Sequence, residues 1–141
     1  MRDVLFDVLF VAVGGSLGAL ARYGTGLATA HWLGKGFPWG TLLVNVVGCF
    51  IMGIVMEVLL DLEAHTKEAL TPALHLQFAL WHKAVGIGFL GGLTTFSTFG
   101  GDTLRHFQSG QPSVALANIA ANVLLSLAAV WCGLMVMRAV D

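Results

Sequence analysis

The charged residues of this chain stand in clusters, and the stretches between the clusters are long and apolar. The uncharged runs cover residues 8–21, 23–34, 36–56, 69–82, 84–101 and 106–137. A helix needs about 20 apolar residues to cross a bilayer, so these runs join into four spans if Arg22 and Lys83 lie near helix ends or inside the protein. Only 11% of the residues are charged, whereas about 25% is usual in soluble domains. We therefore predict an all-α integral membrane protein with one transmembrane domain, 1–141, and spans at 6–32, 38–60, 76–100 and 113–137.

One segment of the third span is unlike a plain membrane helix. Residues 88–99 contain three glycines and four hydroxyl side chains in twelve positions. Glycine weakens the helical ladder, and hydroxyl groups need hydrogen-bond partners that hydrocarbon cannot supply. The segment therefore predicts a broken helix that lines a polar site. Half-helix ends and unwound carbonyls at such breaks bind ions in many transporters.

The first span has a face suited to close helix contact. Gly14, Gly18 and Arg22 follow one another at intervals of four residues, so they share one helical face. Small residues at this spacing let two backbones approach closely in lipid. The Arg22 side chain has two possible roles, which are to reach the membrane interface or to donate to carbonyls exposed at a neighbouring helix break.

Polar side chains also recur at helical spacing in the second and fourth spans. Each set has two interpretations, which are hydrogen bonding between packed helices and the wall of a hydrated path. Nearly all of these groups can donate hydrogen bonds and none is acidic, which favours a small anion over a cation or a proton. The residues are Thr41 and Asn45, followed by Gly48, in the second span, and Asn118, Asn122 and Ser126 in the fourth.

Two phenyl rings stand among the hydroxyls of the third span. Phe96 and Phe99 lie on roughly one helical face, between Thr95, Ser97 and Thr98. Phenylalanines at this spacing commonly pack in a core. Aromatic edges are electropositive, however, so edge-on rings in a polar segment can also contact an anion while excluding water.

The distribution of Lys and Arg gives little preference for one orientation. With four spans, one side carries Arg2, Lys67, Lys83 and Arg138, and the other carries Lys35 and Arg105, with Arg22 if it points that way. A bias this weak permits insertion both ways and an antiparallel homodimer, although an ordinary single orientation is equally compatible. Residues 61–72 are the one clearly wet stretch and are predicted to form a loop.

Three blocks of sequence, in order along the whole chain, closely resemble the Fluc (CrcB) fluoride channels. The residues that carry the resemblance are Gly14, Gly15, Gly18, Ala19, Arg22 and Tyr23 in the first block, Gly40, Thr41, Leu42, Val44, Asn45, Gly48 and Phe50 in the second, and Gly88, Phe89, Gly91, Gly92 and Thr94 to Phe99 in the third. The resemblance implies four helices per subunit and an antiparallel, dual-topology homodimer with two pores. Such a channel lets fluoride leave the bacterial cytoplasm passively across the inner membrane, so no enzyme activity, catalytic residue or nucleic-acid partner is expected.

The resemblance also implies which residues form the sites. A structural sodium ion at the dimer centre is expected on the main-chain carbonyls of Gly91 and Thr94. Asp102 lies where some members carry a glutamate at the pore mouth, and Asn118 lies where some carry a tyrosine. The fluoride pore is expected to use the rings of Phe96 and Phe99, the carboxamide of Asn45, a polar track of Ser97, Thr98 and Thr41, and in the fourth span Asn118, Asn122 and Ser126.

Two other functions remain open on the sequence. A small proton-coupled multidrug-type exporter of dual topology shares this length and hydrophobicity, but such exporters resemble one another in using a glutamate within the first helix. Here the first span has no acid between Asp7 and Arg22. The other alternative is a membrane scaffold whose polar residues only lock helices together.

Overall fold

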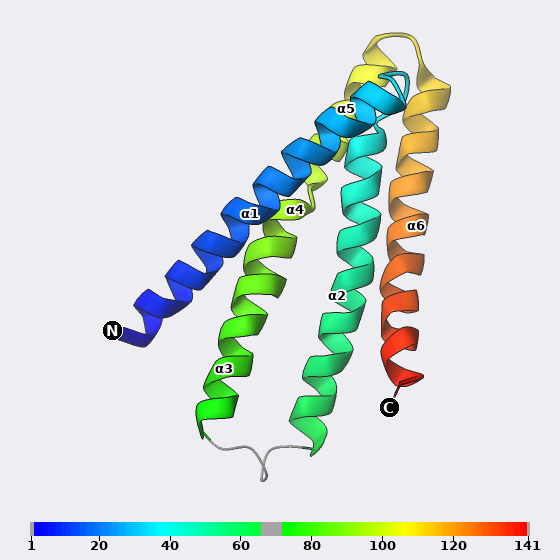
Figure 1. Cartoon of the computed structure of the whole chain (residues 1–141). Helices are drawn as coiled ribbons and strands as arrows, with labels where there is room; N and C mark the ends of the chain where they lie inside the picture. Colours follow the sequence, from blue (N-terminus) through cyan, green and yellow to red (C-terminus); the bar gives the residue numbers. More distant parts are fainter. Residues whose placement is uncertain (1, 66–71, 141) are drawn as a thin grey trace.

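The chain folds into long helices joined by short turns (Figure 1). The computed structural model describes the backbone of residues 2–65 and 72–140 and the side chains of residues 4–61 and 77–140. All regular secondary structure in this part of the chain is helical. The elements are α1 (Arg2–Trp32), α2 (Trp39–His65), α3 (Pro72–His82), the π-helical segment η1 (Lys83–Leu90), α4 (Gly91–Leu93), α5 (Phe96–Gln108) and α6 (Pro112–Arg138).

Three of the described helices are long and apolar enough to cross a membrane. Their apolar stretches are Val4–Trp32, Trp39–Asp61 and Pro112–Arg138, which overlap the predicted spans 6–32, 38–60 and 113–137. Large apolar side chains such as Leu20 and Leu127 are exposed along these helices. Lipid is the solvent that tolerates such a surface. The chain is therefore a multi-pass membrane protein.

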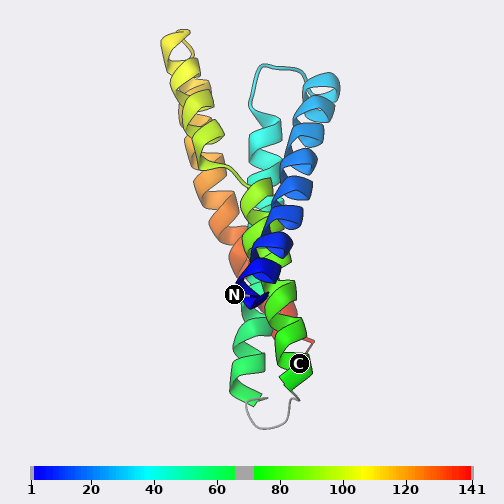
Figure 2. The same ribbon diagram turned by 90° about the vertical axis from the view of Figure 1, so that its left-hand side faces the viewer.

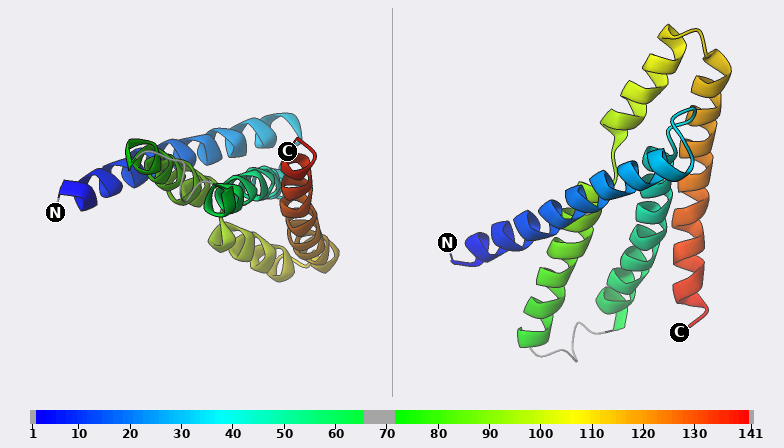
Figure 3. Two further views of the ribbon diagram at one scale, coloured as in Figure 1. Left: turned by 90° about the horizontal axis from the view of Figure 1, so that it is seen from below. Right: turned by 45° about the horizontal axis from the view of Figure 1, so that its top comes forward.

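Helix α2 lies between α1 on one side and α6 on the other (Figures 1 and 3). Helix α1 crosses obliquely and also packs against η1 and α4, while α5 packs against α6. In the upper part of Figure 2, α5 and the start of α6 lie on one side and the end of α1 and the start of α2 lie on the other, whereas lower down α2 and α6 come together. The chain bends between α4 and α5, so these two short elements belong to different sides of the molecule.

Glycines set the closest helix contacts. A Cβ atom at Gly14 would overlap the carbonyl oxygen of Ala84, and one at Gly18 would overlap the carbonyl oxygen of Phe89. The face of α1 predicted for close contact therefore lies against η1 and α4. On the other side of α2, Gly53 faces Gly133 of α6 in the same manner. Backbones that approach this closely gain dispersion contacts that side chains would prevent.

Both ends of the predicted loop at 61–72 are helical. Helix α2 continues through His65, and α3 begins at Pro72. Residues 62–64 are Leu, Glu and Ala, which are good helix formers, so their helical propensity extends α2 beyond the last apolar turn. The remaining part of the predicted loop, 66–71, lies outside the described residues.

Candidate functional site

The chain leaves the helical path at Thr94 and Thr95. Helix α4 ends at Leu93, Thr94 and Thr95 adopt extended dihedral angles (φ −78°, ψ 156° and φ −154°, ψ 117°), and α5 begins at Phe96. The Oγ1 atom of Thr95 accepts a hydrogen bond from the Thr98 N–H at 3.1 Å and so caps α5. β-Branched threonine favours both an extended backbone and the N-cap position. The interruption therefore falls at the two consecutive threonines of segment 88–99.

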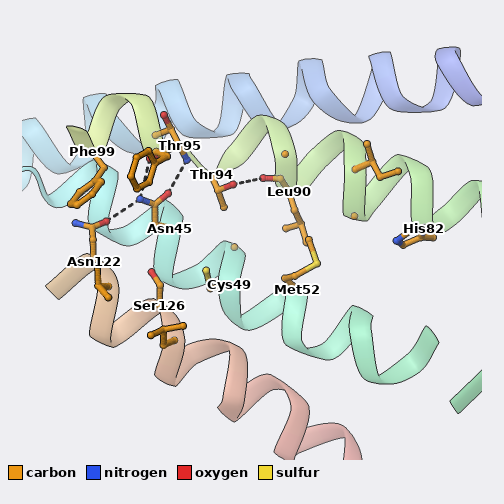
Figure 4. Close-up of a pocket in the computed structure, with 17 residues that line it drawn as sticks. Asn45, Cys49, Met52, His82, Leu90, Thr94, Thr95, Phe99, Asn122 and Ser126 are labelled. Carbon is orange, nitrogen blue, oxygen red and sulfur yellow. Dashed lines mark hydrogen bonds between the residues drawn. The ribbon is translucent and has the colours of Figure 1, made fainter. Parts of the chain in front are cut away.

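Asn45 of α2 holds the interrupted backbone as a neighbouring peptide group would. Its Oδ1 accepts from the Thr95 N–H at 2.8 Å, and its Nδ2 donates to the Thr95 carbonyl at 3.2 Å (Figure 4). In a continuous α-helix the Thr95 N–H would instead donate to the carbonyl of Gly91, four residues earlier. Asn45 thus leaves the Gly91 carbonyl without its helical donor.

Arg22 of α1 contacts the interruption from the opposite side. Its Nη1 donates to the Thr94 carbonyl at 3.2 Å, while the Thr94 N–H closes the last turn of the preceding helix on Leu90 at 3.0 Å. Of the two roles considered for Arg22, the structure shows the second, in which the side chain donates to a carbonyl exposed at a helix break. A charged donor is the stronger kind of hydrogen-bond partner.

A pocket of about 680 Å³ opens beside the interruption. Figure 4 shows side chains from α2, η1, α5 and α6 around it. Among the described residues, no carboxylate, lysine or arginine lines this pocket. The Oγ atom of Ser126 is buried there without a hydrogen-bond partner in the described part of the chain. The predicted site residues that line the pocket are Asn45, Gly48, Gly91, Thr94, Phe96, Phe99, Asn122 and Ser126.

The two phenyl rings form a tilted pair at the pocket. Their centroids are 5.4 Å apart and their planes make an angle of 57°. Phe99 is 9% exposed, whereas Phe96 is 83% exposed and projects from the open side of the pocket. An apolar ring this exposed beside polar groups marks the pocket's edge as a surface for further contact.

The other predicted polar residues lie on different faces. Thr41, Thr98 and Arg22 line a second pocket of about 460 Å³, which also reaches Thr95. The hydroxyl groups of Ser97 and Thr98 lie 3.1 and 3.0 Å from that of Thr95. These residues are near the interruption, but the described part of the large pocket does not include Thr41, Ser97 or Thr98.

Asp102 contacts Thr41, one of the residues that line the second pocket. Its carboxylate accepts from the Thr41 hydroxyl at 2.9 Å and pairs with Arg105 at 3.2 Å. A further pocket of about 340 Å³ includes Thr41, Asp102 and Arg105 together with Lys35. The acid expected at a pore mouth therefore accepts a hydrogen bond from a hydroxyl and forms an ion pair with a guanidinium.

Asn118 lines neither the large pocket nor the two smaller ones. It is fully buried, at 0% exposed, and donates through Nδ2 to the Thr103 hydroxyl at 2.8 Å. Asn122 donates to Asn118 and accepts from Asn45, so amide groups link α2 to α6. Thr103 and the pocket residue Cys49 were not among the residues expected from the sequence. Spacing could have identified both, since Cys49 follows Asn45, and Thr103 follows Phe99, by four residues.

Comparison with known proteins gives a consistent result. Residues 9–134 match the family model described as "CrcB-like protein, Camphor Resistance (CrcB)". A protein of Acidobacterium capsulatum named "Fluoride-specific ion channel FluC" is 44% identical over 128 residues, covering 91% of this chain and 93% of that protein. Proteins of the same name from Magnetococcus marinus (44% over 132 residues, 94% and 98% covered) and Rhizobium etli (41% over 135 residues, 96% and 98% covered) are also similar.

These matches cover almost the whole chain, including every residue of the two pockets at the interruption. Sequence identities of 41–44% over this length show membership of a family and not only a shared fold. The family predicted from the three sequence blocks is therefore confirmed. The chain belongs to the CrcB-like family.

Proposed function

We propose that this chain is a fluoride-selective channel through which fluoride leaves the cell passively. The observation that carries the proposal is the large pocket, in which amide and hydroxyl groups and two phenyl rings converge without a carboxylate among the described residues. Similar proteins in several bacteria are named fluoride-specific ion channels. Passive permeation involves no chemical reaction, so the protein is not an enzyme.

The chemistry of the pocket suits a small anion. Fluoride gives up water only if other donors replace it, and amide N–H and serine O–H groups can do so without holding the ion as a fixed positive charge would. The electropositive edges of Phe96 and Phe99 add weak attraction and exclude bulk water. Ser126 also lines the pocket, and its buried hydroxyl has no hydrogen-bond partner in the described part of the chain.

The proton-coupled exporter is not favoured. Asp7, the acid nearest the middle of α1, forms an ion pair with Lys83 at 2.6 Å. The first span contains no other acid before Arg22.

We further propose that the functional unit is an antiparallel pair of chains. Each chain would cross the membrane four times, with the third crossing made by α3, η1, α4 and α5. In support, Phe96 is 83% exposed and the large pocket is open in the single chain, so a second copy could cover both. The weak asymmetry of Lys and Arg supports dual orientation in the bacterial inner membrane.

A structural sodium ion between the two copies fits the carbonyl groups at the interruption. The Gly91 carbonyl lacks its helical donor because Asn45 holds the Thr95 N–H. The Thr94 carbonyl accepts one hydrogen bond from Arg22, and its second lone pair remains for another partner. Unwound carbonyls of this kind coordinate sodium in transporters with broken helices. Bound there, the ion would supply positive charge at the centre of the pair.

Fluoride efflux from liposomes tests the proposed channel. Purified protein is reconstituted into vesicles loaded with potassium fluoride, and release is followed with a fluoride electrode after a potassium ionophore is added. We expect rapid fluoride release and almost no release from chloride-loaded vesicles. Phe96→Ile should impair release from a dimer that still assembles. Absence of fluoride release from assembled wild-type protein would exclude the channel, and wild-type release by Phe96→Ile would exclude a role for the ring.

A further inference from the structure

A directed chain of buried hydrogen bonds joins the interruption to Phe99. Asn45 Nδ2 donates to Asn122 Oδ1 at 2.9 Å, and Asn122 Nδ2 donates to Asn118 Oδ1 at 2.8 Å. Asn118 Nδ2 donates to Thr103 Oγ1 at 2.8 Å, and Thr103 Oγ1 donates to the Phe99 carbonyl at 2.8 Å. We call these four side chains the amide relay. Each one is a donor to the next, so the relay has a single direction.

The amide relay attaches α5 at two heights. Thr95, held by Asn45, and Thr103, held by Asn118, are eight residues apart, which is about 12 Å along a helix. Phe99 and Thr103 are four residues apart and share one face of α5, and Thr95 is the N-cap residue of that helix. The first attachment comes from α2 and the second from α6. Both phenylalanines lie between them, so the two attachments set how α5 is rotated and where the rings point.

The buried end of the relay has no direct access to the large pocket. Asn118 is 0% exposed, Thr103 is 9% exposed, and neither lines the pocket. A buried hydrogen-bonded pair that only strengthens a bundle can be replaced by two apolar side chains of the same shape at little cost. Here each donor of the relay is oriented by the next acceptor, and the last acceptor is the backbone of a pocket residue. The geometry therefore favours a role in orientation.

We propose that Thr103 and Asn118 are positioning residues that fix the Phe96 and Phe99 rings and thereby set the preference for fluoride over chloride. This inference rests on the proposed channel function. Neither residue contacts the ion. They act through the rotation of α5 relative to α2 and α6.

The first test compares two substitutions at Thr103. Thr103→Val keeps the side-chain shape but removes the acceptor for Asn118 and the donor to Phe99, whereas Thr103→Ser keeps the hydroxyl. We expect valine to lower the ratio of fluoride to chloride permeability by about tenfold and serine to retain the wild-type ratio. Thr25→Val is the matched control, because Thr25 makes the same bond to a carbonyl four residues earlier, on α1 and away from both pockets at the interruption.

A second variant covers the case in which Thr103→Val fails to assemble. The double variant Thr103→Val, Asn118→Leu removes the Asn118 donor and its Thr103 acceptor together, and Asn122, which loses the Asn118 Oδ1, keeps the Asn118 backbone carbonyl as acceptor at 3.1 Å. It should assemble and still show the reduced permeability ratio. A wild-type ratio in this double variant, or in an assembled Thr103→Val channel, would overturn the proposal.

Amide hydrogen exchange separates this proposal from the channel function itself. In detergent-solubilised dimer, the backbone amides of residues 96–103 should exchange faster in Thr103→Val than in Thr103→Ser or Thr25→Val. This measurement needs no fluoride flux. If wild-type protein carried no fluoride, the proposed function would fail, and unchanged exchange in the valine variant would independently refute the relay.

Discussion

Replacing Asn45 by aspartate changes the charge of one atom group and almost nothing of its shape. In Asn45→Asp one oxygen can still accept from the Thr95 N–H, which lies 2.8 Å from Oδ1 in the wild-type structure. The other oxygen takes the place of Nδ2, which lies 3.2 Å from the Thr95 carbonyl and 2.9 Å from Asn122 Oδ1. Two attractive contacts therefore become contacts between acceptors. The substitution also places a negative charge on the wall of the pocket through which fluoride is proposed to pass.

The charge has the larger effect on flux. For an anion about 5 Å from the carboxylate, at an effective dielectric constant of about 20, the repulsion is about 3 kcal/mol. This corresponds to a reduction of about two orders of magnitude in the rate of passage. Asn45→Leu removes the two donated hydrogen bonds and also the one accepted from the Thr95 N–H, without adding charge, so its defect reports the loss of the whole amide. We expect fluoride release to fall in the order wild type, Asn45→Leu, Asn45→Asp.

The assay is fluoride release from liposomes, with each variant first shown by size-exclusion chromatography to form the same dimer as wild type. Leucine loses both hydrogen bonds that aspartate loses and also the one with the Thr95 N–H, so a slower aspartate variant owes its additional defect to the negative charge. An assembled Asn45→Asp channel that conducts as fast as Asn45→Leu would refute the placement of Asn45 beside the permeating ion.

Three further predictions concern the framework of the site. Gly18→Ala forces a Cβ atom against the Phe89 carbonyl and should destabilise the protein by about 1–3 kcal/mol. At Gly24, on the same helix, a Cβ atom meets open space, so Gly24→Ala should be neutral or stabilising by up to about 1 kcal/mol. Thermal unfolding in detergent distinguishes the two variants, and an equal loss of stability in both would contradict the Gly18–Phe89 contact. Arg22→Leu leaves the Thr94 carbonyl without its Arg22 donor and should lower thermal stability. Arg22→Lys keeps a positively charged donor and should recover part of that stability. Identical melting temperatures of the leucine and lysine variants would argue against the Arg22–Thr94 hydrogen bond. Exchanging sodium for a large organic cation should shorten the lifetime of the dimer on dilution, and a lifetime indifferent to sodium would remove the cation from the proposed assembly.

The interruption is the part of the site most open to prediction from sequence. Glycine, serine and threonine are chosen by local backbone needs, and the extended residues Thr94 and Thr95 lie inside the segment for which a broken helix is predicted. Spacings of four residues within one helix, as in Gly14 and Gly18, likewise give the face that packs closely. These patterns depend on a few neighbouring residues, so they can be recognised without knowledge of the rest of the fold.

The partners of the buried amides depend on how whole helices are rotated, and composition does not encode that. Asn118, Asn122 and Ser126 form one stripe on α6, for which helix packing and a hydrated wall are alternative interpretations. The structure divides the stripe, because α6 meets α5 at one height and the large pocket at another. Asn118 is buried against Thr103, whereas Ser126 lines the pocket. Helix packing therefore accounts for Asn118, whereas the hydrated path stays a prediction for Ser126.

Asn45 connects two properties that the sequence treats as separate. Its Oδ1 holds the Thr95 N–H and so keeps the Gly91 carbonyl from completing a helical hydrogen bond, while Asn45 also lines the large pocket. The proposed sodium ligand and the proposed fluoride wall thus depend on one side chain. Asn45→Leu should consequently weaken the dependence of dimer lifetime on sodium as well as fluoride release. Phe96→Ile contacts neither the Gly91 nor the Thr94 carbonyl, so it should reduce fluoride release and leave the sodium dependence unchanged. If Asn45→Leu and Phe96→Ile lost sodium dependence equally, the two sites would be coupled through the dimer rather than through Asn45.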